Sequence, residues 1–233
     1  MILLKSKMNK ITITNLIDFT RKTPRGRQTL VDNLKTPKLK SHVEESGGNY
    51  WVSALSCISN AYKNNIENLI GDKIDELINK LEDHHAKITK DMYQRNINIL
   101  QDFEDFDFNR LKPHSKLLYQ KKPKDKSIVA IKGLPLFAKP HHVFTFKEND
   151  ITKIGAVWFV AKLRGLKYDE LAMVTELLYR YLDINYSNEY EIANDYCIAV
   201  DVNTVNSMNY AQLNNKKIKS LLVRTVGEIK KLI

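Results

Sequence analysis

Four cationic side chains stand within seven residues near the amino end of the sequence. They are Arg21, Lys22, Arg25 and Arg27, and Thr23, Pro24 and Gly26 lie among them. Arginine and lysine at this density bind phosphate oxygens, and a segment that proline and glycine keep extended can follow a nucleic-acid backbone. We therefore predict a phosphate-binding segment here. The alternative is a loop whose charges are simply hydrated.

A second basic segment lies in the middle of the chain and combines lysines with an aromatic ring. Its members are Lys112, Lys116, Tyr119, Lys121, Lys122 and Lys124. Lysines at this spacing would neutralise phosphates, and the ring of Tyr119 offers a surface on which a base can stack. The alternative is a lysine-rich linker that is merely well solvated.

Charge is segregated along the sequence. The formal net charge is +10 over 233 residues, made up of +8 in residues 1–40, −7 in 41–109, +8 in 110–153 and +1 in 154–233. The excess of lysine over arginine, 29 to 8, is also typical of A/T-rich genomes, so the total charge alone decides nothing. The segregation indicates that the basic blocks meet a polyanion, or that they dock on an acidic block of this chain or of a protein partner.

A possible catalytic group lies farther along the chain. Asp201 follows an apolar run, where a carboxylate is costly unless it is paired or solvated. With His142 and Lys147 it could form the Mg²⁺ or Mn²⁺ site of a nuclease. The acid-x-lysine order of such enzymes is missing, because Glu148 follows Lys147. An acid paired with a nearby lysine is the competing interpretation, and we predict no metal site.

Motifs of the common nucleotide-binding and hydrolytic enzymes do not occur in the sequence, among them G-x-x-x-x-G-K-[ST], G-x-G-x-x-G, G-x-S-x-G and H-E-x-x-H. The first hypothesis is therefore a non-enzymatic nucleic-acid-binding protein of bacterial or phage origin that needs no cofactor. The alternatives are a metal-dependent nuclease or phosphodiesterase, and an interaction subunit of an antiviral or toxin–antitoxin assembly.

Composition favours a cytoplasmic protein that does not act in a membrane. Cys57 and Cys197 lie far apart, which excludes a disulfide framework or a zinc ribbon. Apolar runs stay well short of the roughly 18 residues that a membrane span requires. The opening Met-Ile-Leu-Leu-Lys does not fit a secretory signal.

Periodicity predicts four segments. They are a basic segment with short helices (1–48), a helical bundle with an acidic face (49–110), a basic linker (111–126) and an α+β domain (127–233). Apolar residues recur at helical spacing in three stretches of the second segment, at 50–62, 66–81 and 88–106. In the fourth segment we predict strands at 128–131, 134–138, 142–146 and 197–202, and helices at 150–164, 169–183 and 218–233.

Strands and helices are clustered in this prediction and do not alternate regularly. This clustering favours an α+β fold, with a helical bundle followed by a small, mostly antiparallel sheet packed with helices, over a doubly wound α/β sheet. Residues 10–13 alternate in polarity and are predicted to form an edge strand, followed by two short helices, the second at 28–35.

Overall fold

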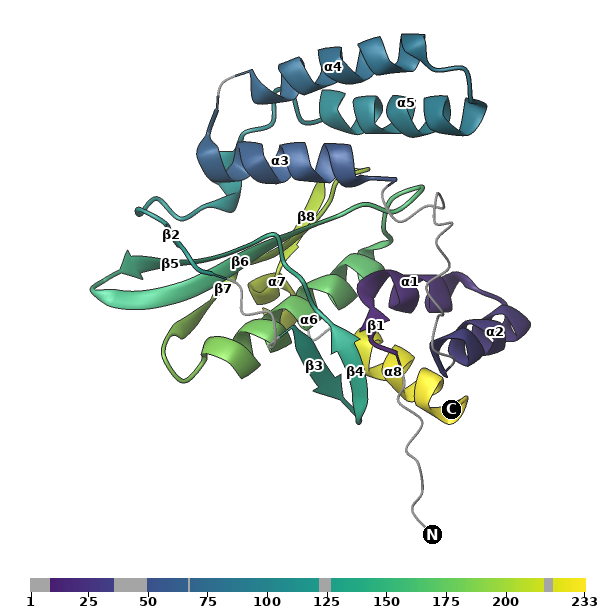
Figure 1. Ribbon diagram of the computed structural model, residues 1–233. Helices are drawn as coiled ribbons and strands as arrows, with labels where there is room; N and C mark the ends of the chain where they lie inside the picture. Colours follow the sequence, from purple (N-terminus) through teal and green to yellow (C-terminus); the bar gives the residue numbers. More distant parts are fainter. Residues whose placement is uncertain (1–8, 36–49, 67, 122–126, 216–219) are drawn as a thin grey trace.

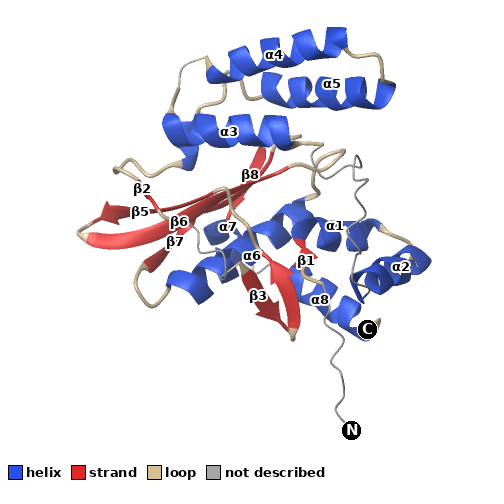
Figure 2. Ribbon diagram, in the orientation of Figure 1, coloured by secondary structure: helices blue, strands red, loops and turns tan. Residues whose placement is uncertain are grey.

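The computed structural model describes residues 9–35, 50–66, 68–121, 127–215 and 220–233, and its fold is α+β (Figure 1). Helices pack on both faces of a five-stranded sheet, and a three-stranded sheet lies beside it (Figure 2). The predicted fold class is confirmed. Among the described residues, no helix combines the length and the apolar content needed to cross a membrane.

The larger sheet has the strand order β2-β5-β6-β7-β8. Its strands are β2 (Leu118–Tyr119), β5 (His142–Glu148), β6 (Ile151–Val160), β7 (Glu191–Asp201) and β8 (Asn206–Asn209). Strands β6 and β7 are parallel and are joined through helix α6 (Tyr168–Tyr186), whereas the other three pairs are antiparallel. The sheet is therefore mixed but mostly antiparallel, as the sequence predicts.

Strand β6 corrects the prediction of a helix over residues 150–164. Residues 154–160 are buried throughout, because β6 lies between two strands and is covered by helices on both faces. Such a strand has an unbroken apolar sequence that periodicity cannot distinguish from a buried helix. Gly155 shows how closely the chains approach: a Cβ there would lie 2.8 Å from the carbonyl oxygen of Tyr196 on β7.

The three predicted bundle helices are confirmed. They are α3 (Val52–Asn64), α4 (Leu69–Asp83) and α5 (Lys87–Gln101). Helix α3 lies on the sheet, and α4 and α5 form the layer beyond it (Figure 1). Tyr62 of α3 is fully buried against Phe144 of β5 and Phe159 of β6, and this aromatic contact joins the bundle to the sheet. A short 3-10 helix, η1 (Phe108–Leu111), leads from the bundle to β2.

The opposite face of the large sheet is covered by α6, which also packs on the three-stranded sheet. That sheet has the order β1-β4-β3, where β1 (Ile11–Thr12) runs parallel to β4 (Leu134–Phe137) and β3 (Ile128–Ile131) antiparallel to it. Helices α1 (Ile13–Arg21), α2 (Pro24–Lys35), α7 (Tyr210–Asn215) and α8 (Leu221–Lys231) complete this side.

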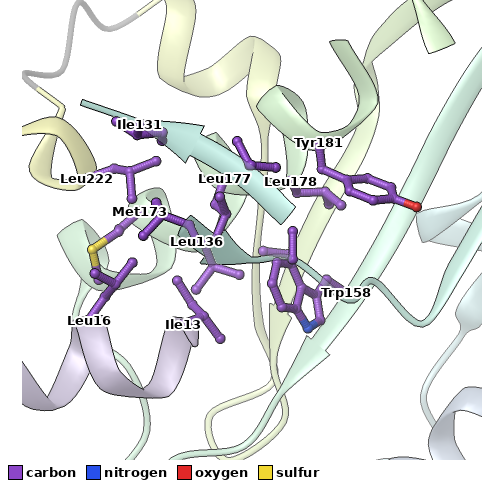
Figure 3. Close-up of a cluster of buried hydrophobic side chains, with 14 of the residues drawn as sticks. Ile13, Leu16, Ile131, Leu136, Trp158, Met173, Leu177, Leu178, Tyr181 and Leu222 are labelled. Atoms are coloured by element: carbon purple, nitrogen blue, oxygen red, sulfur yellow. The ribbon is translucent and has the colours of Figure 1, made fainter. Parts of the chain in front are cut away.

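The amino-terminal helices share one hydrophobic core with the carboxy-terminal part of the chain. Leu16 of α1, Met173 of α6 and Leu222 of α8 meet in this core, together with Leu136 of β4 (Figure 3). Burial of such side chains contributes about 1.5 to 3 kcal/mol each. The basic amino-terminal segment is therefore held firmly on the α+β unit.

Helix α2 starts earlier than predicted. Proline at the first helical position costs no hydrogen bond, because the first backbone N–H groups of a helix have no partner within the helix. The hydroxyl of Thr23 accepts a hydrogen bond from the N–H of Gly26 at 3.4 Å and caps this end. Arg25 and Arg27 consequently lie on a helix, not on the extended segment that proline and glycine suggested.

Candidate nucleic-acid interface

Arg21 is committed to the fold. Its Nε and Nη2 donate to the two carboxylate oxygens of Glu170, at 2.7 and 2.6 Å, and Nη2 also donates to the carbonyl oxygen of Gly165 at 2.6 Å. The side chain of Glu170 is only 3% exposed, and that of Arg21 is 25% exposed. This bidentate pair fastens the end of α1 to the start of α6.

The acidic partner of this pair has a displaced pKa. Burial raises the pKa of Glu170. The opposing effect is larger, because the carboxylate accepts hydrogen bonds from Arg21, from the N–H of Lys167 and from Thr20, and because Arg21 is positively charged. The net result is a pKa below the ordinary 4.5. The hydrogen bond to Glu170 correspondingly raises the pKa of Arg21, against a smaller opposing effect of burial.

We expect this pair to make folding stability depend on acidity. Because the pKa of Glu170 is lower in the folded chain than in the unfolded chain, its stabilising contribution is complete above pH 4.5 and is lost as the pH falls through the folded-state pKa. Urea unfolding at pH 7 and at pH 3 measures this difference. The Glu170→Gln variant should lose less stability between the two pH values than the natural chain, and an equal loss would contradict the assignment.

Arg27 also has a structural position. Its guanidinium donates to the carbonyl oxygens of Phe19 and Thr20 at 3.0 and 3.2 Å, which closes the carboxyl end of α1. Nη1 pairs with Glu228 of α8 at 3.1 Å. Two of the four clustered cations therefore fasten α1 and α2 to α6 and α8.

Lys22 and Arg25 remain available to a ligand. Both are exposed, and over the described part of the chain neither side chain has a hydrogen bond or an ion pair. They lie at the junction of α1 and α2, on opposite sides of Pro24. Because the contacts of Arg21 and Arg27 fix this junction, the backbone that carries the two exposed cations is firmly held.

A hollow of about 680 Å³ lies between α1, α2 and the two described residues before β1. Its described lining contains Lys10 and Lys22 but no aspartate or glutamate. Nζ of Lys10 lies 4.0 Å from the centre of the Phe137 ring. Three carboxamides, a threonine hydroxyl and two leucines make up most of the rest of the wall: Asn9, Asn15, Asn33, Thr29, Leu30 and Leu34. A lining of this kind favours an anion, and the volume is typical of small-molecule sites.

Of the polar residues that line this hollow, the sequence predicts only Lys22 as a ligand-binding residue. A signal was present in α2, where lining residues recur at the spacing of one helix face, namely Gly26, Thr29, Leu30, Asn33 and Leu34. The rest of the wall comes from residues before and within α1, such as Asn9 and Asn15. Only the folded arrangement brings these two parts together.

The second basic segment lies at the other end of the molecule, where β2 borders the large sheet (Figure 1). Lys116 and Lys121 are exposed there, whereas Lys112 is half-buried with its Nζ 4.8 Å from the ring centre of Tyr62. Burial lowers the pKa of Lys112. Lys122 and Lys124 lie outside the described residues. The two basic segments thus form separate surfaces.

Tyr119 is engaged within this second surface. Its ring packs edge-on against His142 and Phe144, and Nζ of Lys63 lies 5.5 Å from its ring centre. Burial raises the pKa of its hydroxyl. A nucleobase would have to compete with Lys63 for the face of this ring, which makes this surface a weaker candidate than the hollow.

The three residues of the nuclease hypothesis are not brought together. Along β7, Cys197 and Ala199 face the core beneath α6, and Asp201 follows them on that face. His142 lies on the opposite face, against α3, where its Nε2 contacts Ser59. Lys147 is exposed at the other end of β5 from His142. The described residues contain no cluster of three or more histidine, cysteine or acidic side chains that could hold a metal ion.

Ser59 and His142 have the separation of a nucleophile and its base, but the same ring nitrogen also contacts a backbone carbonyl oxygen. Oγ of Ser59 lies 2.8 Å from Nε2 of His142. The same Nε2 lies 2.9 Å from the carbonyl oxygen of Ser59, which can only accept a hydrogen bond. A hydrogen bond to this carbonyl oxygen requires the ring proton on Nε2, and in that tautomer the nitrogen cannot take a proton from the serine. The contact therefore joins α3 to β5.

Comparisons with protein-family models, with curated proteins and with solved structures find no match to this chain. The functional argument consequently rests on the geometry of the hollow and of the charges around it.

Proposed function

We propose that this protein binds nucleic acid and acts as a binding protein, not as an enzyme, through the hollow and the exposed cations Lys22 and Arg25. The observation that carries the proposal is the lining of the hollow, where two lysines and several amides meet without a carboxylate in the described wall. Phosphate oxygens are the acceptors that such donors bind best.

The expected mechanism is neutralisation of phosphates with release of counterions. Lys10 and Lys22 border the hollow, and Arg25 is the second residue of α2, next to the lining residue Gly26. Ammonium and guanidinium groups in this position contact backbone phosphates without reading sequence. Binding should therefore weaken steeply as salt is added and should show little sequence preference.

Charge reversal at the two exposed cations tests the proposal. We expect the Lys22→Glu, Arg25→Glu double variant to bind a labelled oligonucleotide about ten- to 100-fold more weakly, because it loses two charge-assisted contacts. The slope of the logarithm of affinity against the logarithm of salt concentration should also become shallower, by roughly 0.7 to 0.9 for each lost phosphate contact. Fluorescence anisotropy over a series of salt concentrations measures both quantities.

The matched control carries the same change of charge elsewhere. Lys87 and Lys90 are exposed on α5, in the outer layer of the bundle. The Lys87→Glu, Lys90→Glu variant should keep most of the affinity. Equal losses in the two variants would point to a diffuse charge effect, and no loss in the first variant would overturn the proposed interface. Arg21 and Arg27 are left intact, because replacing them would disturb folding.

A further inference from the structure

The hollow contains more than cations, and its other groups indicate which form of nucleic acid it takes. Its wall is lined by three kinds of residue: lysines, residues with carboxamide or hydroxyl groups, and the leucines Leu30 and Leu34. A phosphate alone needs the first kind only. The second and third kinds are what proteins use to hold an unpaired base, by hydrogen bonds to its edge and contacts with its ring.

The amide groups have defined hydrogen-bonding capacities. Oδ1 of Asn15 accepts from the N–H and the hydroxyl of Thr12, at 2.9 and 2.8 Å, so its Nδ2 is the part that can donate to a ligand. The hydroxyl of Thr29 donates to the carbonyl oxygen of Arg25 at 3.1 Å and keeps its capacity to accept. Asn33 is exposed on the next turn of α2 and offers both a donor and an acceptor.

The apolar part of the wall is firmly placed. Leu34 is 8% exposed and belongs to the main core, and Leu30 packs against the same core. A Cβ at Gly26 would lie 3.3 Å from Cβ of Lys22, so the glycine lets the Lys22 side chain pack close to α2. The hollow therefore has an apolar part suited to the face of a ring and polar groups suited to its edge.

We propose that the ligand is single-stranded nucleic acid and that one unpaired base enters the hollow while Lys22 holds the adjacent phosphate. This inference rests on the proposed function. In a duplex the bases are stacked and paired, and extruding one costs a few kcal/mol. A duplex can therefore place its phosphates on the exposed cations, but its paired and stacked bases offer neither a free edge to Asn33 nor a free ring face to Leu30.

The test compares a labelled single strand of about 20 nucleotides with the duplex of the same sequence. Fluorescence anisotropy should show about ten-fold tighter binding of the single strand, because only its bases use the interior of the hollow. Asn33→Ala should weaken binding of the single strand about five-fold or more while leaving duplex binding and the salt dependence unchanged. Asn79→Ala, at an exposed position on α4, is the matched control and should change neither.

Each outcome bears on one of the two proposals in a distinguishable way. Duplex binding as tight as single-strand binding, with an unchanged Asn33→Ala variant, would overturn the single-strand inference and leave the proposed function standing. Failure of both nucleic acids to bind at low salt would overturn the proposed function and the inference with it. Circular dichroism of Asn33→Ala should match that of the natural chain, since the residue is exposed.

Discussion

Replacing Arg21 with alanine is expected to lower the free energy of unfolding by about 3 kcal/mol, toward the lower end of the range for a broken buried ion pair. The carboxylate of Glu170 is 3% exposed and would lose both guanidinium hydrogen bonds. The N–H of Lys167 and the hydroxyl of Thr20 would remain its hydrogen-bond donors. Urea unfolding followed by circular dichroism measures the change.

Two comparisons separate this effect from a general effect of charge. Arg25→Ala, on the exposed side of α2, should change the free energy of unfolding by about 0.5 kcal/mol or less. The Arg21→Met, Glu170→Leu double variant should recover much of the stability, because an apolar pair leaves no unpaired buried charge. A stability of Arg21→Ala equal to that of Arg25→Ala would show that the pair does not hold α1 on α6.

The cationic cluster shows what a sequence can and cannot predict about a site. Composition indicates that residues 21–27 are basic, but it does not distinguish cations that bind a ligand from cations that bind their own chain. The partners of Arg21 and Arg27, Glu170 and Glu228, lie far away in sequence. Only tertiary packing divides the cluster into two structural arginines and two exposed cations.

The same limit explains which elements were predictable. The helices of the bundle have apolar residues on one face and follow one another directly, so local periodicity identifies them. Strand β6 was mistaken for a helix because it is buried on both faces. The alternation of residues 10–13 predicts the edge strand β1, which the structure confirms, but its pairing of Ile11 with Leu136 joins distant parts of the chain and has no local signal. The two-residue strand β2 lies within the predicted linker and corrects that prediction.

Asp201 should matter for folding and not for catalysis. Its side chain is fully buried, and its Oδ2 accepts from the N–H of Leu166 at 2.6 Å and from the hydroxyl of Thr204 at 2.7 Å. Oδ1 accepts from the N–H of Asn203 at 3.1 Å. The carboxylate thus holds the loop after β6 against the turn after β7. Gly165, in the loop after β6, has a φ of +66°.

Asp201→Ala is therefore expected to lower the free energy of unfolding by about 3 to 5 kcal/mol, because it leaves several donors without an acceptor. Asp201→Asn keeps the shape of the side chain, but its amide N–H₂ would face the donors of one carboxylate oxygen. We therefore expect the free energy of unfolding to fall by about 1 to 3 kcal/mol. Urea unfolding measures both, and Asp195→Ala, at an exposed position on the same strand, is the control.

The result that would contradict this role is also specific. If Asp201 were a metal-binding acid, Asp201→Asn would retain its stability, and Mg²⁺ or Mn²⁺ would raise the melting temperature of the natural chain but not that of the variant. We expect neither ion to change the melting temperature, because the three donors already occupy both carboxylate oxygens. Metal-dependent cleavage of a plasmid that disappears in Asp201→Asn without a loss of stability would make Asp201 part of a nuclease site.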